Sequence, residues 1–275
     1  MKWRIINSGK NDSALNMAID EAIMLGVISG ESLPTIRFYD WEPATVSCGY
    51  NQDVSKEVDF DAVEKGGYGF VRRPTGGRLV LHEREITYSV IAPIEGRLSG
   101  SVLESYGVIS KALACGMELL GVGVEFEKGS LSSHHQRQQA NPCFTSSSRL
   151  ELKYGNRKIV GSAQVRKNNV LLQHGSILLE QNQEKVAYLV PGLSSEQRTK
   201  LASFLKRKTI AINEITQKEI SYELAVDYFS KGFVEAWSED EFEFHNYLTR
   251  AENIRSEELK MSKYLTAKWN KNKAF

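Results

Sequence analysis

Apolar side chains recur at helical spacing in two long stretches of the chain. The first is expected to run to about Ser29, and small apolar residues share one of its faces: Ala14, Ala18, Ala22 and Leu25. The second spans Ser101–Leu120 and begins with the Ser-x-x-Glu pattern of a capping box. Further helices are expected at 59–65, 194–207 and 221–237, and a charged, solvated terminal helix from about Ser256.

Alternation of apolar and polar residues predicts β-strands between these helices. In the first hundred residues they are Trp3–Ile6, Thr35–Tyr39, Thr45–Tyr50, Gly69–Arg72 and Glu85–Ala92. Later, turns at Gly155-Asn156 and Asn168-Asn169 divide a three-stranded meander: Arg149–Tyr154, Lys158–Arg166 and Val170–Leu179. Because helices and hairpins alternate irregularly, the pattern favours an α+β domain over a doubly wound parallel sheet.

Composition narrows the class of protein. The 275 residues are 41% hydrophobic, enough for a sizeable core, and 35 basic against 34 acidic residues argue against bulk nucleic-acid binding. The first residues lack an apolar signal-peptide region, and no apolar run is long enough to predict a membrane span. Three widely spaced cysteines favour a reduced, cytoplasmic protein, and no CxxC or HExxH pattern indicates a metal site.

The stretch Phe70–Val90 contains two adjacent glycines between arginines. Gly76 and Gly77 suit a backbone that takes unusual dihedral angles or approaches a ligand closely. Arg72 and Arg73 precede them and Arg78 follows, which favours a carboxylate or phosphate as the ligand. A hairpin whose loop happens to be charged explains the same pattern, so this stretch alone leaves both interpretations open.

A cysteine and a lysine further along could act together. Cys143 follows Pro142 at the end of a polar segment, where it is placed to be accessible, although an incidental thiol is the alternative. Lys158 is expected to alternate with Val160 on one face of a strand, next to the small residues 161–163. A thiolate is a good nucleophile toward acyl groups, and a nearby ammonium both lowers a thiol pKa and steadies an oxyanion. No GxSxG, GxxxxGK[ST] or Cys-His-Asn pattern supports another mechanism.

Four motifs in order resemble the superfamily of lipoate–protein ligases, octanoyltransferases and biotin ligases. They are RRPTGGRLVLHE at 72–83, EITYSV at 85–90, GNRKIVGSAQVR at 155–166 and LLQHGSILL at 171–179. The resemblance implies an α+β fold related to the class II synthetase core, with a mixed, largely antiparallel sheet flanked by helices. It assigns residues 1–245 to one catalytic domain and 246–275 to a helical tail.

The resemblance also implies which residues form the site. The loop side consists of Arg72, Gly76, Gly77, Arg78 and His82. Lys158 matches the active-site lysine of the family. Gly161, Ser162 and Ala163 are expected against the carbonyl end of the acyl group, with Gln164 and His174 flanking it.

The segment around Cys143 resembles the Bacillus-type octanoyltransferases that take octanoyl from a carrier protein. Cys143-Phe144, Ser148 and Glu151-Leu152 match their pattern, whereas Ser147 and Leu150 depart from it. This implies transfer of octanoyl from acyl carrier protein, through a Cys143 thioester, to a lysine of a lipoyl-domain protein such as the glycine-cleavage H protein. Neither a cofactor nor a metal is expected, and a monomer without nucleic-acid or membrane partners is predicted.

Three other functions fit the same motifs. An ATP-dependent lipoate–protein ligase would form lipoyl-AMP and would need ATP and magnesium. An amidotransferase would move octanoyl between lipoyl domains. A non-catalytic acyl-binding module would keep the cavity but lose turnover, which the presence of both Cys143 and Lys158 disfavours.

Overall fold

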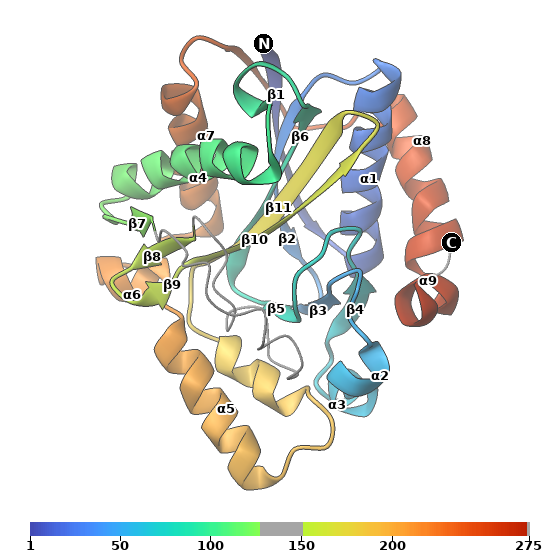
Figure 1. The fold of residues 1–275 in the computed structure, drawn as a ribbon, viewed down its shortest axis with the longest axis vertical. Coiled ribbons are helices and arrows are strands. Elements are labelled where there is room, and N and C mark those ends of the chain that lie inside the picture. Colours follow the sequence, from blue (N-terminus) through green and yellow to red (C-terminus); the bar gives the residue numbers. More distant parts are fainter. Residues whose placement is uncertain (127–150, 274–275) are drawn as a thin grey trace.

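A six-stranded mixed sheet forms the centre of the computed structural model, which describes residues 1–126 and 151–273 (Figure 1). Its strand order is β10-β11-β6-β2-β1-β12. The strands are β1 (Lys2–Asn11), β2 (Thr35–Trp41), β6 (Glu85–Pro93), β10 (Val160–Lys167), β11 (Val170–Leu178) and β12 (Glu241–His245). Pairing is antiparallel from β10 to β2 and parallel from β2 to β12. The expected α+β fold with a largely antiparallel sheet is confirmed.

Helices cover both faces of this sheet. On one side α4 (Val102–Leu119) packs against α7 (Tyr222–Ala236), and on the other α1 (Ser13–Ser29) packs against α8 (Arg250–Leu259) (Figure 1). The predicted capping box of α4 is present, since Ser101 and Glu104 bond to each other's main chain. α4 and α7 meet at two glycines: a Cβ on Gly232 would lie 2.3 Å from Gly116 N, so only glycine permits this close crossing.

A second sheet of three strands lies beside the first. It joins β4 (Gly69–Arg72), β3 (Thr45–Cys48) and β5 (Val80–His82), and the short helices α2 (Val54–Glu57) and α3 (Phe60–Lys65) connect β3 to β4. The sequence pattern did not predict β5, because its three residues lie in a continuous apolar run without alternation.

The expected meander over residues 149–179 is wrong in its first half. β8 (Leu152–Tyr154) and β9 (Arg157–Lys158) pair with β7 (Glu125–Phe126) in a small sheet of their own, and only β10 and β11 join the central sheet. The chain changes sheets at Ile159, which is fully buried and whose carbonyl accepts from Leu178 N. Lys158 and Val160 therefore do not share one strand, contrary to the sequence-based expectation.

The remaining elements lead to a packed C-terminal segment. They are the 3₁₀ turns Gly96–Leu98 and Gln183–Tyr188, α5 (Ser195–Lys208), α6 (Ile212–Thr216), a π-helical turn (Lys260–Tyr264) and α9 (Ala267–Asn272). The predicted solvated terminal helix is wrong, because Tyr264 and Trp269 are buried against α1 and β4. The division at residue 245 into a catalytic domain and a tail stays a prediction.

Among the described residues, every helix is too short or too polar to cross a lipid bilayer. Cys143, Phe144, Ser147, Ser148 and Leu150 lie outside the described residues.

Candidate active site

A cavity lies where the central sheet meets the second sheet. Residues far apart in sequence line it, from α1, from both sheets and from the loop after β4. They are Met17, Tyr39, Trp41, Arg73, Val80, His82, Thr87, Gly161, Ser162, Ala163, His174, Gly175 and Ser176. The structure thus brings together five predicted site residues: His82, Gly161, Ser162, Ala163 and His174.

The register of the central sheet explains one wall of the cavity. Gly161, Ser176, Thr87 and Tyr39 are successive partners across four strands, so they form one row. Small residues occupy the β10–β11 end of this row, so their side chains do not fill the cavity beside it. Gly175 is required there, because a Cβ would lie 2.5 Å from Ser162 Oγ.

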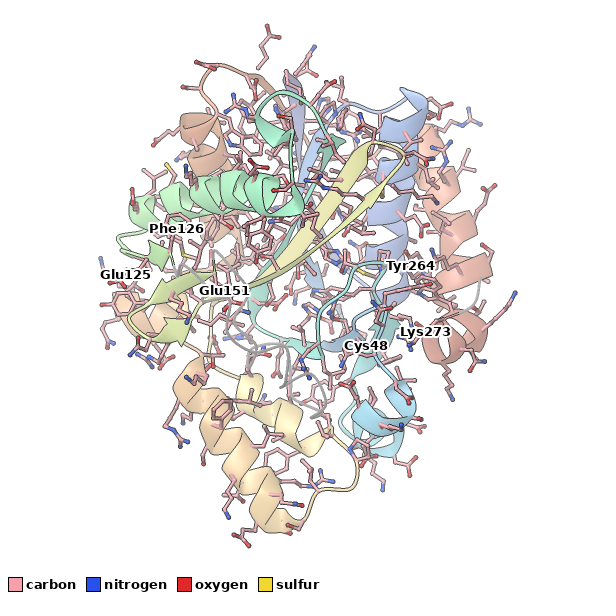
Figure 2. All side chains as sticks on the ribbon, in the orientation of Figure 1. Cys48, Glu125, Phe126, Glu151, Tyr264 and Lys273 are labelled. Atoms are coloured by element: carbon pink, nitrogen blue, oxygen red, sulfur yellow. The ribbon has the colours of Figure 1, made fainter. Side chains whose placement is uncertain are left out.

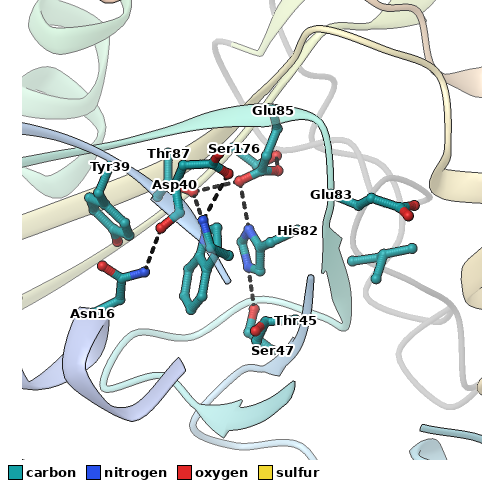
Figure 3. Close-up of polar contacts among 12 residues, drawn as sticks. Asn16, Tyr39, Asp40, Thr45, Ser47, His82, Glu83, Glu85, Thr87 and Ser176 are labelled. Atoms are coloured by element: carbon teal, nitrogen blue, oxygen red, sulfur yellow. Dashed lines mark hydrogen bonds and ion pairs between the residues drawn. The ribbon is translucent and has the colours of Figure 1, made fainter. Parts of the chain in front are cut away.

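His82 stands on one side of the cavity in a chain of hydrogen bonds (Figure 3). Its Nδ1 lies 2.7 Å from Glu85 Oε1, and its Nε2 lies 2.6 Å from Ser47 Oγ. The ring also stacks on Trp41, with 4.3 Å between centroids. Glu85 is almost fully buried and accepts further bonds from Thr87 and Ser176, so its carboxylate is well satisfied.

His174 repeats this arrangement on the α1 side. Its Nδ1 lies 3.1 Å from Asp20 Oδ2, and its Nε2 lies 2.6 Å from Thr75 Oγ1. Burial lowers the pKa of His174 below its ordinary value by more than the Asp20 carboxylate raises it, so the ring is neutral at neutral pH. Burial by itself would raise the pKa of Asp20, but Arg37 and His174 hold it below its usual range.

Arg73 completes the chain of hydrogen bonds through His82. Its Nη1 donates to Ser47 Oγ at 2.5 Å, because a guanidinium only donates. His82 therefore has a polar partner at each ring nitrogen, and these partners hold the orientation of the ring at the cavity wall.

The two arginines before the glycines have different positions. Arg73 lines the cavity and also donates to the carbonyls of Ser47, Gly76 and Arg78, at 2.8–3.2 Å. Arg72 is fully buried, does not line the cavity, and donates to main-chain carbonyls instead. Arg72 is the last residue of β4 and Arg73 is the first residue of the following loop, and only Arg73 lines the cavity. Both arginines flank the glycines in the sequence, but the family resemblance assigned only Arg72 to the site, whereas Arg73 is the one that lines the cavity.

Five other predicted residues, Lys158 among them, do not line the cavity. Gly76 and Gly77 form the backbone of the loop, with Gly77 at φ 95°, and Arg78 contributes its carbonyl to Arg73. Gln164 Nε2 bonds to Ser105 on α4 and to Gln173 on the neighbouring strand β11. The residues that the sequence analysis missed include Met17, Trp41 and Thr87, which no motif singles out because the fold alone places them there.

Lys158 is held by a carboxylate close to the predicted nucleophile in sequence. Its Nζ lies 2.8 Å from Glu151 Oε1, and both side chains are buried. Its carbonyl accepts from Ile210 N, which ties β9 to the end of α5. Because Cys143 lies outside the described residues, the predicted approach of Cys143 to Lys158 stays a prediction.

The two described cysteines are poor nucleophiles. Burial raises the pKa of the Cys48 thiol to about 11, and the sequence-based expectation that Cys48 packs in the interior is confirmed. Burial and the adjacent Glu235 carboxylate raise the pKa of Cys115. In the described part of the chain, no cluster of acidic, histidine or cysteine side chains is suited to hold a metal ion.

The chain matches the family described as the lipoyl protein ligase A/B catalytic domain over residues 12–234. It belongs to this family. Octanoyltransferase LipM of Kyrpidia tusciae is 41% identical over 276 residues, covering 98% of this chain and 99% of that protein. Octanoyltransferase LipM of Bacillus subtilis is 39% identical, covering 98% of this chain and 97% of that protein.

Solved structures of lipoate–protein ligases share the fold. A lipoate-protein ligase A crystallised with ATP superposes with a TM-score of 0.79 at 22% identity, covering 98% of this chain and 99% of that one. A bipartite lipoate protein ligase of Thermoplasma acidophilum, studied with its E2 lipoyl domain, superposes with a TM-score of 0.77 at 22% identity. The match covers 98% of this chain and 95% of that one. The predicted superfamily and fold are therefore confirmed.

Proposed function

We propose that the protein is an octanoyltransferase of lipoate biosynthesis and that the cavity beside Arg73 holds the octanoyl chain. The observation that carries this proposal is the similarity to octanoyltransferases at 39–41% identity over 98% of the chain. The cavity supports it, since apolar side chains and a small-residue wall suit an alkyl chain. Arg73 and the two anchored imidazoles supply the few polar groups that such a site needs.

The reaction proceeds in two acyl transfers. The Cys143 thiolate attacks the thioester carbonyl of the octanoyl donor, and the donor thiolate leaves with a proton from solvent or a neighbouring acid. The amine of an acceptor lysine then attacks the enzyme thioester, forms an amide, loses a proton and releases the Cys143 thiolate. The Lys158 ammonium favours the thiolate and steadies the negative charge on the carbonyl oxygen.

The donor is an acyl carrier protein, and the acceptor is a lipoyl-domain protein such as the glycine-cleavage H protein. An acyl donor and a lipoyl-domain acceptor follow from the family and its octanoyltransferase members. Since a thioester is already activated, this route uses no nucleotide, metal or other cofactor. The cytoplasmic location and the monomeric state stay predictions from the sequence.

The covalent step is tested by intact-mass measurement after incubation with octanoyl-acyl carrier protein. Wild type is expected to gain the mass of one octanoyl group, and Cys143→Ser is expected to stay unmodified. Cys115→Ser is the matched control and should acylate like wild type, because its thiol is a poor nucleophile. If wild type and Cys143→Ser both stay unmodified, the thioester route is wrong.

A separate measurement distinguishes the ATP-dependent ligase. That enzyme would catalyse lipoate-dependent exchange of pyrophosphate into ATP, whereas the transferase would not. The proposed function predicts no exchange and octanoyl transfer without added ATP. Transfer of octanoyl from an already modified lipoyl domain, without a carrier-protein donor, would identify the amidotransferase.

A further inference from the structure

The C-terminal helix α9 is bonded to the strand that leads into the cavity. Trp269 Nε1 donates to Arg72 O at 2.9 Å, and Arg72 N donates to Asn270 Oδ1 at 2.8 Å. Arg72 Nε also donates to the carbonyls of Trp269 and Asn270, at 3.2 and 3.1 Å. Two consecutive residues of α9 thus hold both the main chain and the side chain of one residue of β4.

Arg72 extends this connection to the loop after β3. Its Nη1 donates to the carbonyls of Gly49, Tyr50 and Gln52, at 2.9–3.0 Å. Lys273 Nζ donates to Asn51 O at 2.9 Å, so α9 contacts this loop directly as well. The loop over 49–52 and the end of β4 are therefore fixed by the same C-terminal residues.

The loop over 49–52 in turn supports the loop over 74–78 beside the cavity, which contains Gly76 and Gly77 and is here called the glycine loop. Tyr50 N donates to Thr75 O at 2.8 Å, and a Cβ on Gly49 would lie 2.1 Å from Gly77 O, so the two loops are in close contact. Thr75 holds His174 through its hydroxyl, and Arg73 follows Arg72 directly. A shift of Arg72 would therefore reach two groups that define the cavity.

The C-terminal segment is itself anchored on α1, the helix that supplies Met17 to the cavity. Lys263 Nζ lies 2.7 Å from Glu21 Oε2 and 4.0 Å above the Trp269 ring. Tyr264 OH donates to Glu21 Oε2 at 2.6 Å. Figure 2 shows Tyr264 and Lys273 along this segment, beside α1.

We propose that residues 264–273, here called the C-terminal latch, are positioning residues for the acyl cavity. Trp269 and Asn270 set the direction of Arg72 and thereby hold Arg73 and the glycine loop in place. If α9 were held only by apolar packing, burial of the Trp269 indole ring would be sufficient and no directed hydrogen bonds would be required. Four directed hydrogen bonds to the one residue that precedes Arg73 instead specify an orientation. The activity readout of this inference rests on the proposed octanoyl transfer.

Trp269→Phe tests the latch, because it keeps an aromatic ring and removes the indole N–H. Trp3→Phe is the matched control: it removes an indole N–H bonded at the same 2.9 Å to Asp240, at the start of β1. We expect similar losses of stability, but only Trp269→Phe should speed amide hydrogen exchange over residues 75–79. Only Trp269→Phe should also lower kcat/KM for the octanoyl donor, by about 10-fold.

Asn270 provides a second test if Trp269→Phe does not fold. Asn270→Ala removes the acceptor for Arg72 N and should reproduce the faster exchange. Asn270→Asp also loses the Nδ2 donor to Tyr264 O but keeps the acceptor for Arg72 N, so its exchange should be slower than that of Asn270→Ala. Unchanged exchange over 75–79 and unchanged kcat/KM in the latch variants would overturn the inference. If wild type itself transfers no octanoyl, the proposed function fails, while the exchange comparison still decides the latch.

Discussion

The Lys158 ammonium lies 2.8 Å from the Glu151 carboxylate, and both side chains are removed from solvent. β8 and β9 form a tight hairpin, which brings these residues together although seven positions separate them. A buried charge is costly unless a partner accompanies it, so each residue stabilises the other in place. The lysine predicted to assist catalysis is therefore held in a defined orientation.

Glu151→Gln is expected to reduce the free energy of unfolding by about 3–5 kcal/mol, because it leaves a buried ammonium without its counter-charge. The matched control is Glu214→Gln, whose carboxylate lies 3.7 Å from Arg157 with both side chains about 40% exposed. A pair exposed to this degree contributes only about 1 kcal/mol or less. Urea unfolding measures both variants, and equal losses would contradict the importance of the buried pair.

Burial of His174 predicts a dependence of stability on pH. Because its folded pKa lies below the ordinary 6.5, the unfolded chain binds a proton first as the pH falls. Stability should therefore decrease below about pH 6.5, by up to about 1.4 kcal/mol per pH unit, until the folded pKa is reached. Urea unfolding between about pH 5 and pH 7.5 should show a smaller slope for His174→Gln, and an unchanged slope would refute the assignment.

Arg72→Lys and Arg73→Lys should differ in their effect on octanoyl transfer. An ammonium cannot replace the fork of hydrogen bonds from Arg72, and each buried carbonyl left without a donor costs about 1–3 kcal/mol, so Arg72→Lys should mainly reduce stability. Arg73→Lys should also reduce stability, since Arg73 donates to buried carbonyls too, but it should in addition reduce octanoyl transfer, because Arg73 lines the cavity. Thermal unfolding and initial rates are measured on both variants, and a loss of transfer in Arg72→Lys that equals or exceeds the loss in Arg73→Lys would disprove this difference.

The adjacent glycines of the cavity loop should also respond differently. Gly77 has φ 95°, so Gly77→Ala should cost about 1–2 kcal/mol of stability. Gly76 does not need a positive φ and a Cβ there would meet no atom within 4 Å, so Gly76→Ala should leave stability nearly unchanged. If Gly76→Ala nevertheless slows transfer, the lack of a side chain at Gly76 lets a ligand approach closely, which is one of the interpretations that the sequence left open. Unfolding and rate measurements separate the two effects.

Local patterns in the sequence were sufficient for most helices and strands. The capping box of α4 and the glycine after α1 define element ends through contacts within a few residues, which propensity and spacing report directly. The predicted meander failed because the choice between two sheets at Ile159 depends on partners far away in the chain. The prediction of a solvated terminal helix failed for the same reason. Trp269 is buried by β4 and α1, and the charged residues next to it in sequence do not predict these distant partners.

The sequence by itself determined the family, the α+β class and the motifs that contribute to the site, because these depend on residue types in a fixed order. The tertiary structure decided which members of each motif face the cavity. Arg72 and Arg73 are indistinguishable as neighbouring letters, yet packing at the end of β4 turns Arg73 toward the cavity and Arg72 toward the carbonyls around α9. The carboxylate partners of Lys158, His82 and His174 likewise come into place only when the chain folds, because a buried polar group needs a partner.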